Sequence, residues 1–173
     1  TTYAPPYAYT NGATATVTAD AITGAGDATL FSSVNASGVL FAEIAALSDD
    51  LTSRKITLGS GTSEDQIGIR FGTSSNEIPA LVYNGAVQAN MQHIVSNTTN
   101  FNKIALRYAL NDFSLWINGV EVVTDVSGSV TWTSPLSTVS FDSGSGTEPF
   151  YGKTRQVAVY NYLTDAQMIT LTT

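Results

Sequence analysis

The sequence has 173 residues, 43% of them hydrophobic and 10% aromatic, which is enough for one domain with a core and too short for two ordinary ones. Charged residues make up 12%, about half the usual ~25%, and the formal net charge is -7. Because no basic run occurs, this balance excludes nucleic acid as a partner. The absence of cysteine excludes disulfide bonds and thiolate metal sites.

The first residues predict an extended lead-in. Pro5 and Pro6 stand among three tyrosines, a composition that suits a linker from a preceding domain. No charged start and no apolar run is present, so we expect neither a signal peptide nor membrane insertion. We assign residues 1–12 to the lead-in and residues 13–173 to one domain.

Short runs of β-forming residues follow, separated by Gly- and Ser-rich breaks. The segment 41–47, FAEIAAL, has a composition that also suits a helix, but its neighbours favour a strand. No stretch alternates strands with helices, which argues against a parallel α/β fold. Besides the hairpins described next, strands are predicted at 13–19, 29–34, 38–46, 54–59, 66–71, 137–141 and 153–160.

The clearest pattern is the alternation of apolar and polar residues from Asn102 to Val123, which predicts consecutive antiparallel strands. Asn111-Asp112 and Asn118-Gly119 are predicted turns, since Asn and Gly tolerate the positive φ of tight hairpins. Asn84-Gly85 repeats the device. The residues predicted to share the inward face are Ile104, Leu106, Tyr108, Phe113, Leu115 and Ile117, and Val157 is also expected in the core.

A helix signature occurs near the end of the sequence, in LTDAQMITL. Thr164 is a good N-cap, and Gln167 lies three residues later, as a capping box requires. Met168 and Leu171 would then face the rest of the domain. Together these patterns predict an all-β, two-sheet antiparallel jelly-roll sandwich with a short C-terminal helix.

Two segments resemble the concanavalin A-like lectin and glucanase superfamily, in its laminin G-like branch: FNKIALRYALNDFSLWINGVEVVTD (101–125) and YGKTRQVAVYNYLTDAQMITLT (151–172). Thr154 stands where an aliphatic residue is usual, and Gln167 where Glu is usual. The resemblance implies two curved sheets and binding of glycans or proteins, sometimes with calcium. The hydroxyl-rich composition is similar to modules of bacterial-virus tail proteins and bacterial surface proteins.

Catalytic patterns are absent from the sequence. Enzymes on this scaffold carry two nearby carboxylates, commonly as E-x-D-x-x-E on one strand, whose alternate residues share a face. Glu43 lacks such neighbours, and Glu64 and Asp65 are adjacent and would point to opposite faces. His93 is the single histidine, so a nucleophile–histidine pair is not indicated and a multi-histidine zinc site is excluded. We therefore expect that the protein is not an enzyme and that it requires no cofactor.

Calcium binding is left open, because oxygen ligands are plentiful. Asp49 and Asp50 are weak candidates for calcium ligands. Alternatively, the two residues belong to a solvated turn or cap. Further acidic or amide residues occur in predicted loops, without ordered ligand spacing, at Asn111, Asp112, Asp125, Asp142 and Glu148.

The predicted hairpin suggests a ligand platform. A two-residue loop at Asn111-Asp112 would pair Arg107 with Trp116 on the face opposite the core. A tryptophan can stack on a sugar while a guanidinium binds its hydroxyls or carboxylate. The alternative is that another segment covers Trp116.

Other candidate ligand residues lie in turns and loops. Asn118 belongs to the adjoining turn, and Trp132 lies in a predicted loop as either an exposed contact or an anchor beneath it. Tyr151 is a weaker candidate, as are Tyr83 and Phe150, for which packing is favoured.

These observations lead to three hypotheses. The first is a non-catalytic recognition module of a virion or cell-surface protein that binds a cell-surface carbohydrate, outside the cell or on a virion surface. It would be part of a larger polypeptide, for which homo-oligomerisation is left open. The second is a structural module for capsid decoration or tail assembly, without glycan binding. The third, least favoured, is a glycan-degrading enzyme.

Overall fold

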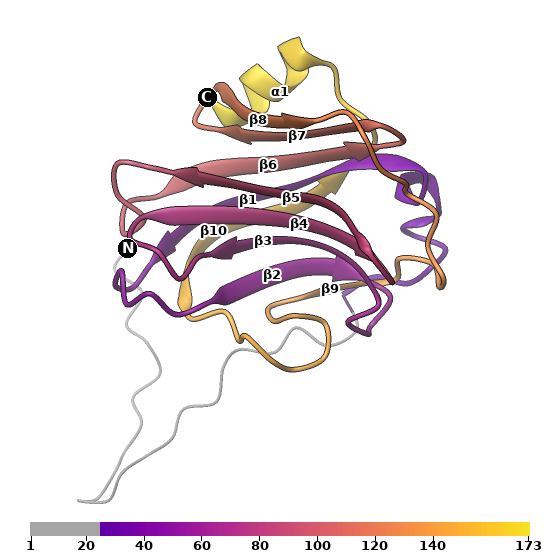
Figure 1. Cartoon of the computed structure of the whole chain (residues 1–173), viewed down its shortest axis with the longest axis horizontal. Coiled ribbons are helices and arrows are strands. Elements are labelled where there is room, and N and C mark those ends of the chain that lie inside the picture. The colour runs from indigo at the N-terminus through magenta and orange to yellow at the C-terminus, as the bar shows by residue number, and fades with distance from the viewer. Residues whose placement is uncertain (1–24) are drawn as a thin grey trace, which may run out of the picture.

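The computed structural model describes residues 25–173, which form two antiparallel five-stranded sheets packed face to face (Figure 1). Sheet A has the order β10 (Gly152–Tyr160), β1 (Ser37–Ala46), β6 (Asn102–Ala109), β7 (Asp112–Ile117) and β8 (Val120–Asp125). Sheet B has the order β5 (Val87–Ile94), β4 (Glu77–Asn84), β3 (Asp65–Phe71), β2 (Arg54–Gly59) and β9 (Thr138–Ser140). A short 3-10 helix, η1 (Ser32–Val34), precedes β1, and α1 (Asp165–Thr172) follows β10. The predicted all-β sandwich with a short C-terminal helix is confirmed.

The core fills the space between the sheets, as the alternation of the strands requires. Ile56 and Leu58 of β2 and Ile67 and Ile69 of β3 are inaccessible to solvent. From sheet A, the predicted core residues Ile104, Leu106 and Leu115 are likewise fully buried. Val157 packs against the same cluster but is only partly buried, because β10 is an edge strand.

The hairpin of β6 and β7 is confirmed, but the predicted turn is wrong. Ala109 pairs with Asp112, so the turn consists of Leu110 and Asn111. Asn111 takes a left-handed conformation with φ 56°, which asparagine tolerates. Its backbone N–H donates to the Gly128 carbonyl at 3.1 Å, and its side-chain oxygen accepts a hydrogen bond from the Gly128 N–H at 3.1 Å. These contacts fix Asn111 inside the turn, so β7 begins at Asp112.

The corrected register also changes the pairs across the hairpin. Arg107 pairs with Ser114, and Trp116 pairs with Ala105, so the predicted direct pairing of Arg107 with Trp116 is wrong. Both side chains nevertheless lie on the face away from Leu106, as predicted, because the register shift is an even number of residues.

The other predicted elements have mixed outcomes. Strand 29–34 is wrong: this segment contains turns and η1, and the Asp27 carboxylate accepts hydrogen bonds from the amides of Thr29 and Leu30 at 2.8 Å. Strand 13–19 and the lead-in 1–12 lie outside the described residues. The strands predicted at 38–46, 54–59, 66–71, 137–141 and 153–160 are confirmed with bounds shifted by at most one residue, and Asn84-Gly85 separates β4 from β5.

Helix α1 covers part of the outer face of sheet A. Its capping box is present, and the Thr164 amide donates to the Gln167 side chain at 2.9 Å. Met168 is fully buried in a second apolar cluster with Phe41 and Trp116, and Leu171 packs at its edge. The helix therefore gives sheet A a second, smaller core on the side away from sheet B.

Candidate functional site

Arg107 and Trp116, the pair predicted to form a ligand platform, are buried beneath α1. Trp116 exposes 4% of its surface and Arg107 exposes 6%. The indole N–H of Trp116 donates to the Ser114 hydroxyl at 2.9 Å, so its polar group is already bonded. This arrangement corresponds to the alternative stated above, in which another segment covers Trp116.

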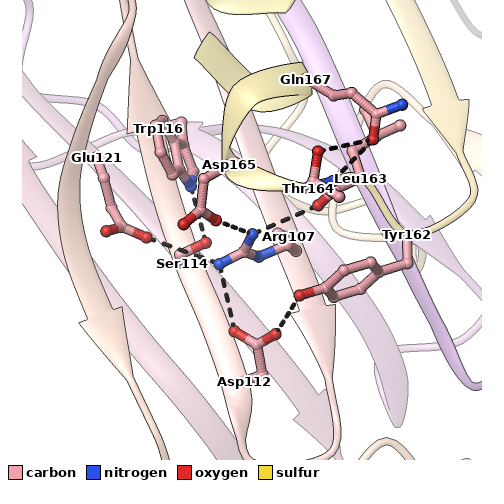
Figure 2. A network of polar contacts seen from close by, with 10 residues as sticks. All are labelled: Arg107, Asp112, Ser114, Trp116, Glu121, Tyr162, Leu163, Thr164, Asp165 and Gln167. Atoms are coloured by element: carbon pink, nitrogen blue, oxygen red, sulfur yellow. Dashed lines mark hydrogen bonds and ion pairs between the residues drawn. The ribbon is translucent and has the colours of Figure 1, made fainter.

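Figure 2 shows Arg107 enclosed between β6 and the first turn of α1. Its guanidinium donates to the Asp165 carboxylate at 2.5 Å and to Asp112 at 3.4 Å, and it lies 5.3 Å from the centroid of the Tyr162 ring. Burial disfavours the charge, but the Asp165 hydrogen bond and the Asp112 carboxylate outweigh it, and the pKa of Arg107 is raised. The network fixes α1 on the sheet.

Trp132 and Asn118 are also engaged within the protein. The Trp132 indole donates to the Asn35 carbonyl at 2.6 Å, and its ring meets Tyr108 edge-on with centroids 6.4 Å apart. Trp132 thus anchors its loop on the core. Asn118 occupies the turn between β7 and β8 with φ 50, and its side chain bonds the Lys103 amide and the Asn102 side chain at 2.9 Å.

Tyr151 is the most exposed of the aromatic candidates from the sequence, with 39% of its surface accessible. The Arg54 guanidinium lies 5.1 Å from the centroid of its ring. Asp50 in turn accepts a hydrogen bond from Arg54 at 2.6 Å, and this bond lowers the pKa of Asp50. Asp49 accepts hydrogen bonds from Ser75 and Asn76, so both candidate calcium ligands hold loops in place.

A different surface, the outer face of sheet B, gathers polar side chains beside a hollow. Where Ile56, Ile67 and their neighbours point into the core, the alternate positions of β2 and β3 carry Lys55, Gln66 and Arg70. Together with Tyr83 and Glu148 they line a cavity of about 400 Å³. We call this hollow the sheet B cleft.

The Lys55 side chain lines the sheet B cleft and passes beside Gly68. It exposes 3% of its surface, and its ammonium donates to the Gln66 side-chain oxygen. A Cβ at Gly68 would come within 2.4 Å of the Lys55 side chain. The Lys55 side chain can therefore occupy this position only because residue 68 is a glycine. Burial lowers the pKa of Lys55, Glu148 acts in the opposite sense, and Arg70 lowers it further.

Arg70 stands beside Lys55, its cross-strand partner on β2. Its guanidinium lies 3.6 Å from the Glu148 carboxylate, longer than a direct hydrogen bond, and its Nε is buried without a partner in the described part of the chain. Glu148 is held by the Ser53 hydroxyl at 2.5 Å. The Arg70 side chain as a whole is 32% exposed, so part of it remains accessible to a ligand.

The loop from Asp142 to Glu148 forms one wall of the cleft. It is fastened at both ends to β2: the Thr57 hydroxyl donates to the Asp142 carbonyl at 2.8 Å, and the Lys55 amide donates to the Glu148 carbonyl at 3.1 Å. Between these points, Gly144 and Gly146 adopt positive φ, which glycine allows at no steric cost. Opposite this wall, Leu81, Tyr83 and Val87 supply apolar surface.

The sequence carries one signal for this site, the polar residues that alternate with the core isoleucines of the predicted strands 54–59 and 66–71. That alternation alone does not show that the polar residues of the two strands lie side by side. Lys55 and Arg70 become neighbours only in the register of β2 and β3, and the loop 142–148 comes from far along the chain. Tyr83 is among the weaker candidates from the sequence, with packing favoured, and it lines this cleft.

Two features are absent from residues 25–173. No group of three or more His, Cys, Asp or Glu side chains is placed to hold a metal ion there. Within the same residues, no helix has the length and apolarity needed to span a bilayer.

Comparisons with known proteins bear on the fold. No protein-family model matches the chain, and no curated protein matches it either. Among solved structures, the CBM40 module of the Ruminococcus gnavus IT-sialidase, bound to α2,3-sialyllactose, has a TM-score of 0.65 at 17% identity over 82% of this chain and 86% of that one. The leech intramolecular trans-sialidase gives 0.63 at 18% identity, covering 82% of this chain and 24% of that chain.

Mouse laminin α1 domains LG4-5 give a TM-score of 0.54 at 13% identity, over 80% of this chain and 37% of that chain. These proteins share a jelly-roll sandwich, so this chain has the concanavalin A-like fold that its sequence resembles. The neighbours with this architecture include carbohydrate-binding modules and laminin G-like domains.

Proposed function

We propose that this chain is a non-catalytic carbohydrate-recognition module that binds an acidic glycan in the sheet B cleft. The observation that carries the proposal is the pairing of two cationic side chains, Lys55 and Arg70, in a hollow on the outer face of sheet B, with the Arg70 side chain 32% exposed. A planar guanidinium matches the two oxygens of a sugar carboxylate.

The rest of the cleft suits a sugar ring. Gln66 offers an amide for hydroxyl groups, and Tyr83 beside Leu81 offers apolar surface for the C–H face of the ring. The CBM40 module of similar fold was solved with sialyllactose, an acidic glycan, which supports the same ligand class here. A cell-surface glycan as ligand, and a place outside the cell or on a virion surface, belong to this proposal.

The absence of catalysis also belongs to the proposal. The sequence lacks the spaced carboxylates of glycosidases on this scaffold. In the cleft, Glu148 is engaged by Ser53 and lies beside Arg70. Glu43, another carboxylate considered from the sequence, lies on β1 in an ion pair with Arg155 at 2.7 Å.

The test is titration calorimetry of the intact chain with α2,3-sialyllactose, α2,6-sialyllactose and lactose. We expect binding of at least one sialylated ligand, and a loss of at least about tenfold for Arg70→Gln, equal to about 1.4 kcal/mol. Arg155→Gln is the matched control, because it also removes one strand arginine paired with one glutamate but lies outside the cleft. Its affinity should be unchanged.

Three outcomes would contradict parts of the proposal. Equal affinities for lactose and sialyllactose would contradict the proposed preference for an acidic glycan. An equal loss of affinity in Arg70→Gln and Arg155→Gln would show that the sheet B cleft is not the binding site. No binding on a broad glycan array, together with assembly that depends on protein concentration, would favour the structural module for capsid decoration or tail assembly.

A further inference from the structure

One carboxylate faces both cations of the sheet B cleft. The Glu148 carboxylate lies 3.6 Å from the Arg70 guanidinium. Burial lowers the pKa of Lys55, and the Glu148 charge acts in the opposite sense, so this charge also reaches the Lys55 ammonium. Glu64 lines the cleft as well, but it forms no ion pair among residues 25–173. Glu148 is therefore the counter-ion of the cationic pair.

Glu148 is held in this position by contacts that do not involve Arg70. Its carboxylate accepts a hydrogen bond from the Ser53 hydroxyl at 2.5 Å, and its carbonyl accepts one from the Lys55 backbone N–H at 3.1 Å. Its φ of 52° is left-handed, a conformation that glutamate rarely adopts. The separation from Arg70 is longer than a direct hydrogen bond. Glu148 therefore lowers the net charge around Arg70, and its own position depends on β2 and Ser53.

A sugar carboxylate that enters the cleft would meet this counter-ion. The Arg70 and Glu148 side chains are both partly exposed, so a carboxylate bound to the Arg70 guanidinium would lie near the Glu148 carboxylate. Like charges at such short range oppose each other, and the effect is larger at a protein surface than in bulk water. The ligand and Glu148 would therefore compete for the same cation.

We propose that Glu148 sets the affinity of the sheet B cleft for acidic ligands by acting as an internal competitor of the ligand carboxylate. This inference rests on the proposed binding of an acidic glycan by Lys55 and Arg70. A neutral glycan lacks the charge that Glu148 opposes, so Glu148 weakens the binding of acidic ligands selectively. Glu148 thus narrows the difference in affinity between an acidic glycan and its neutral counterpart.

The test is titration calorimetry of the intact chain and of Glu148→Gln with α2,3-sialyllactose and with lactose. Glutamine removes the charge and still accepts the Ser53 hydrogen bond, so we expect the affinity for sialyllactose to rise at least about fivefold. The affinity for lactose should change by less than about twofold, because lactose carries no charge.

Two further variants control for charge and for folding. Glu64→Gln removes the same charge from another part of the cleft wall, and it should raise the affinity for sialyllactose by less than about twofold. Glu148→Asn also removes the charge, and asparagine adopts left-handed φ more readily than glutamate. It should show the same gain as Glu148→Gln, and it provides the measurement if Glu148→Gln does not fold.

The outcomes separate this inference from the proposed function. If sialyllactose binds the parent and Arg70→Gln weakens it, but neither Glu148 variant binds more tightly, Glu148 is not a competitor and the proposed function stands. A gain of equal size with lactose, or in Glu64→Gln, would also overturn the inference. If neither the parent nor the Glu148 variants bind a sialylated ligand, the proposed function fails and this inference fails with it.

Discussion

Replacing Trp116 with alanine should destabilise the protein without altering glycan binding. Trp116 exposes 4% of its surface and packs with Phe41 and Met168 under α1. A tryptophan buries about 150–250 Å², which at ~25 cal/mol per Å² gives roughly 4–6 kcal/mol. Measured truncations of buried aromatics cost about 3–5 kcal/mol. We therefore expect a loss of about 3–5 kcal/mol and a melting temperature lowered by about 6–20 °C.

Urea denaturation measures the first quantity, and calorimetry with sialyllactose well below the melting temperature measures the second. Trp116→Phe is the control, since it retains a large apolar side chain and should lose much less stability. A cost below about 1 kcal/mol for Trp116→Ala would refute the burial argument. A folded variant that no longer binds glycan would restore Trp116 as a ligand residue.

The other predictions concern the cleft, the core and the helix. Gly68→Ala should lower glycan affinity at least about tenfold, because the new Cβ would displace Lys55, and unchanged affinity in calorimetry would contradict this. Tyr108→Phe removes the hydrogen bond to the Val34 carbonyl at 3.0 Å and should cost about 1–3 kcal/mol in urea denaturation at pH 7. Burial raises the pKa of Tyr108, so the unfolded state ionises first above about pH 10, and the parent should lose stability there more steeply than Tyr108→Phe. Met168→Ala should cost about 2–5 kcal/mol, and an unchanged melting temperature would show that α1 adds no packing.

The sequence predicted most strands because one apolar face alternates with one polar face over each of them. Leu106 and Leu115 were correctly assigned to the core for that reason. The hairpin turn was misplaced because Asn111-Asp112 and Leu110-Asn111 both contain the asparagine that accepts positive φ. Contacts with residues outside the hairpin, such as those of Asn111 with Gly128 and of Asp112 with Tyr162, accompany the second arrangement.

Burial on the outer faces of the sheets could not be predicted in the same way. The capping box located the start of α1 but not the surface on which it docks, so the cover over Arg107 and Trp116 was left as an alternative. The sheet B cleft depends on the register of β2 with β3 and on a loop some 80 residues later in the chain. Local periodicity carries no information about either contact.

The way the 142–148 loop is fastened separates ligand preference from folding. Both ends bond to β2 through main-chain atoms of Asp142 and Glu148, which every residue type provides. Between those ends, Ser143 is buried and hydrogen-bonds Ser145 and Thr147, and Gly144 and Gly146 adopt positive φ, so these three positions maintain the shape of the loop. Ser145 and Thr147 are exposed and line the cleft, so substitutions there should change ligand contacts at small cost to the scaffold. They are the natural positions at which to redirect the proposed glycan binding toward a different sugar.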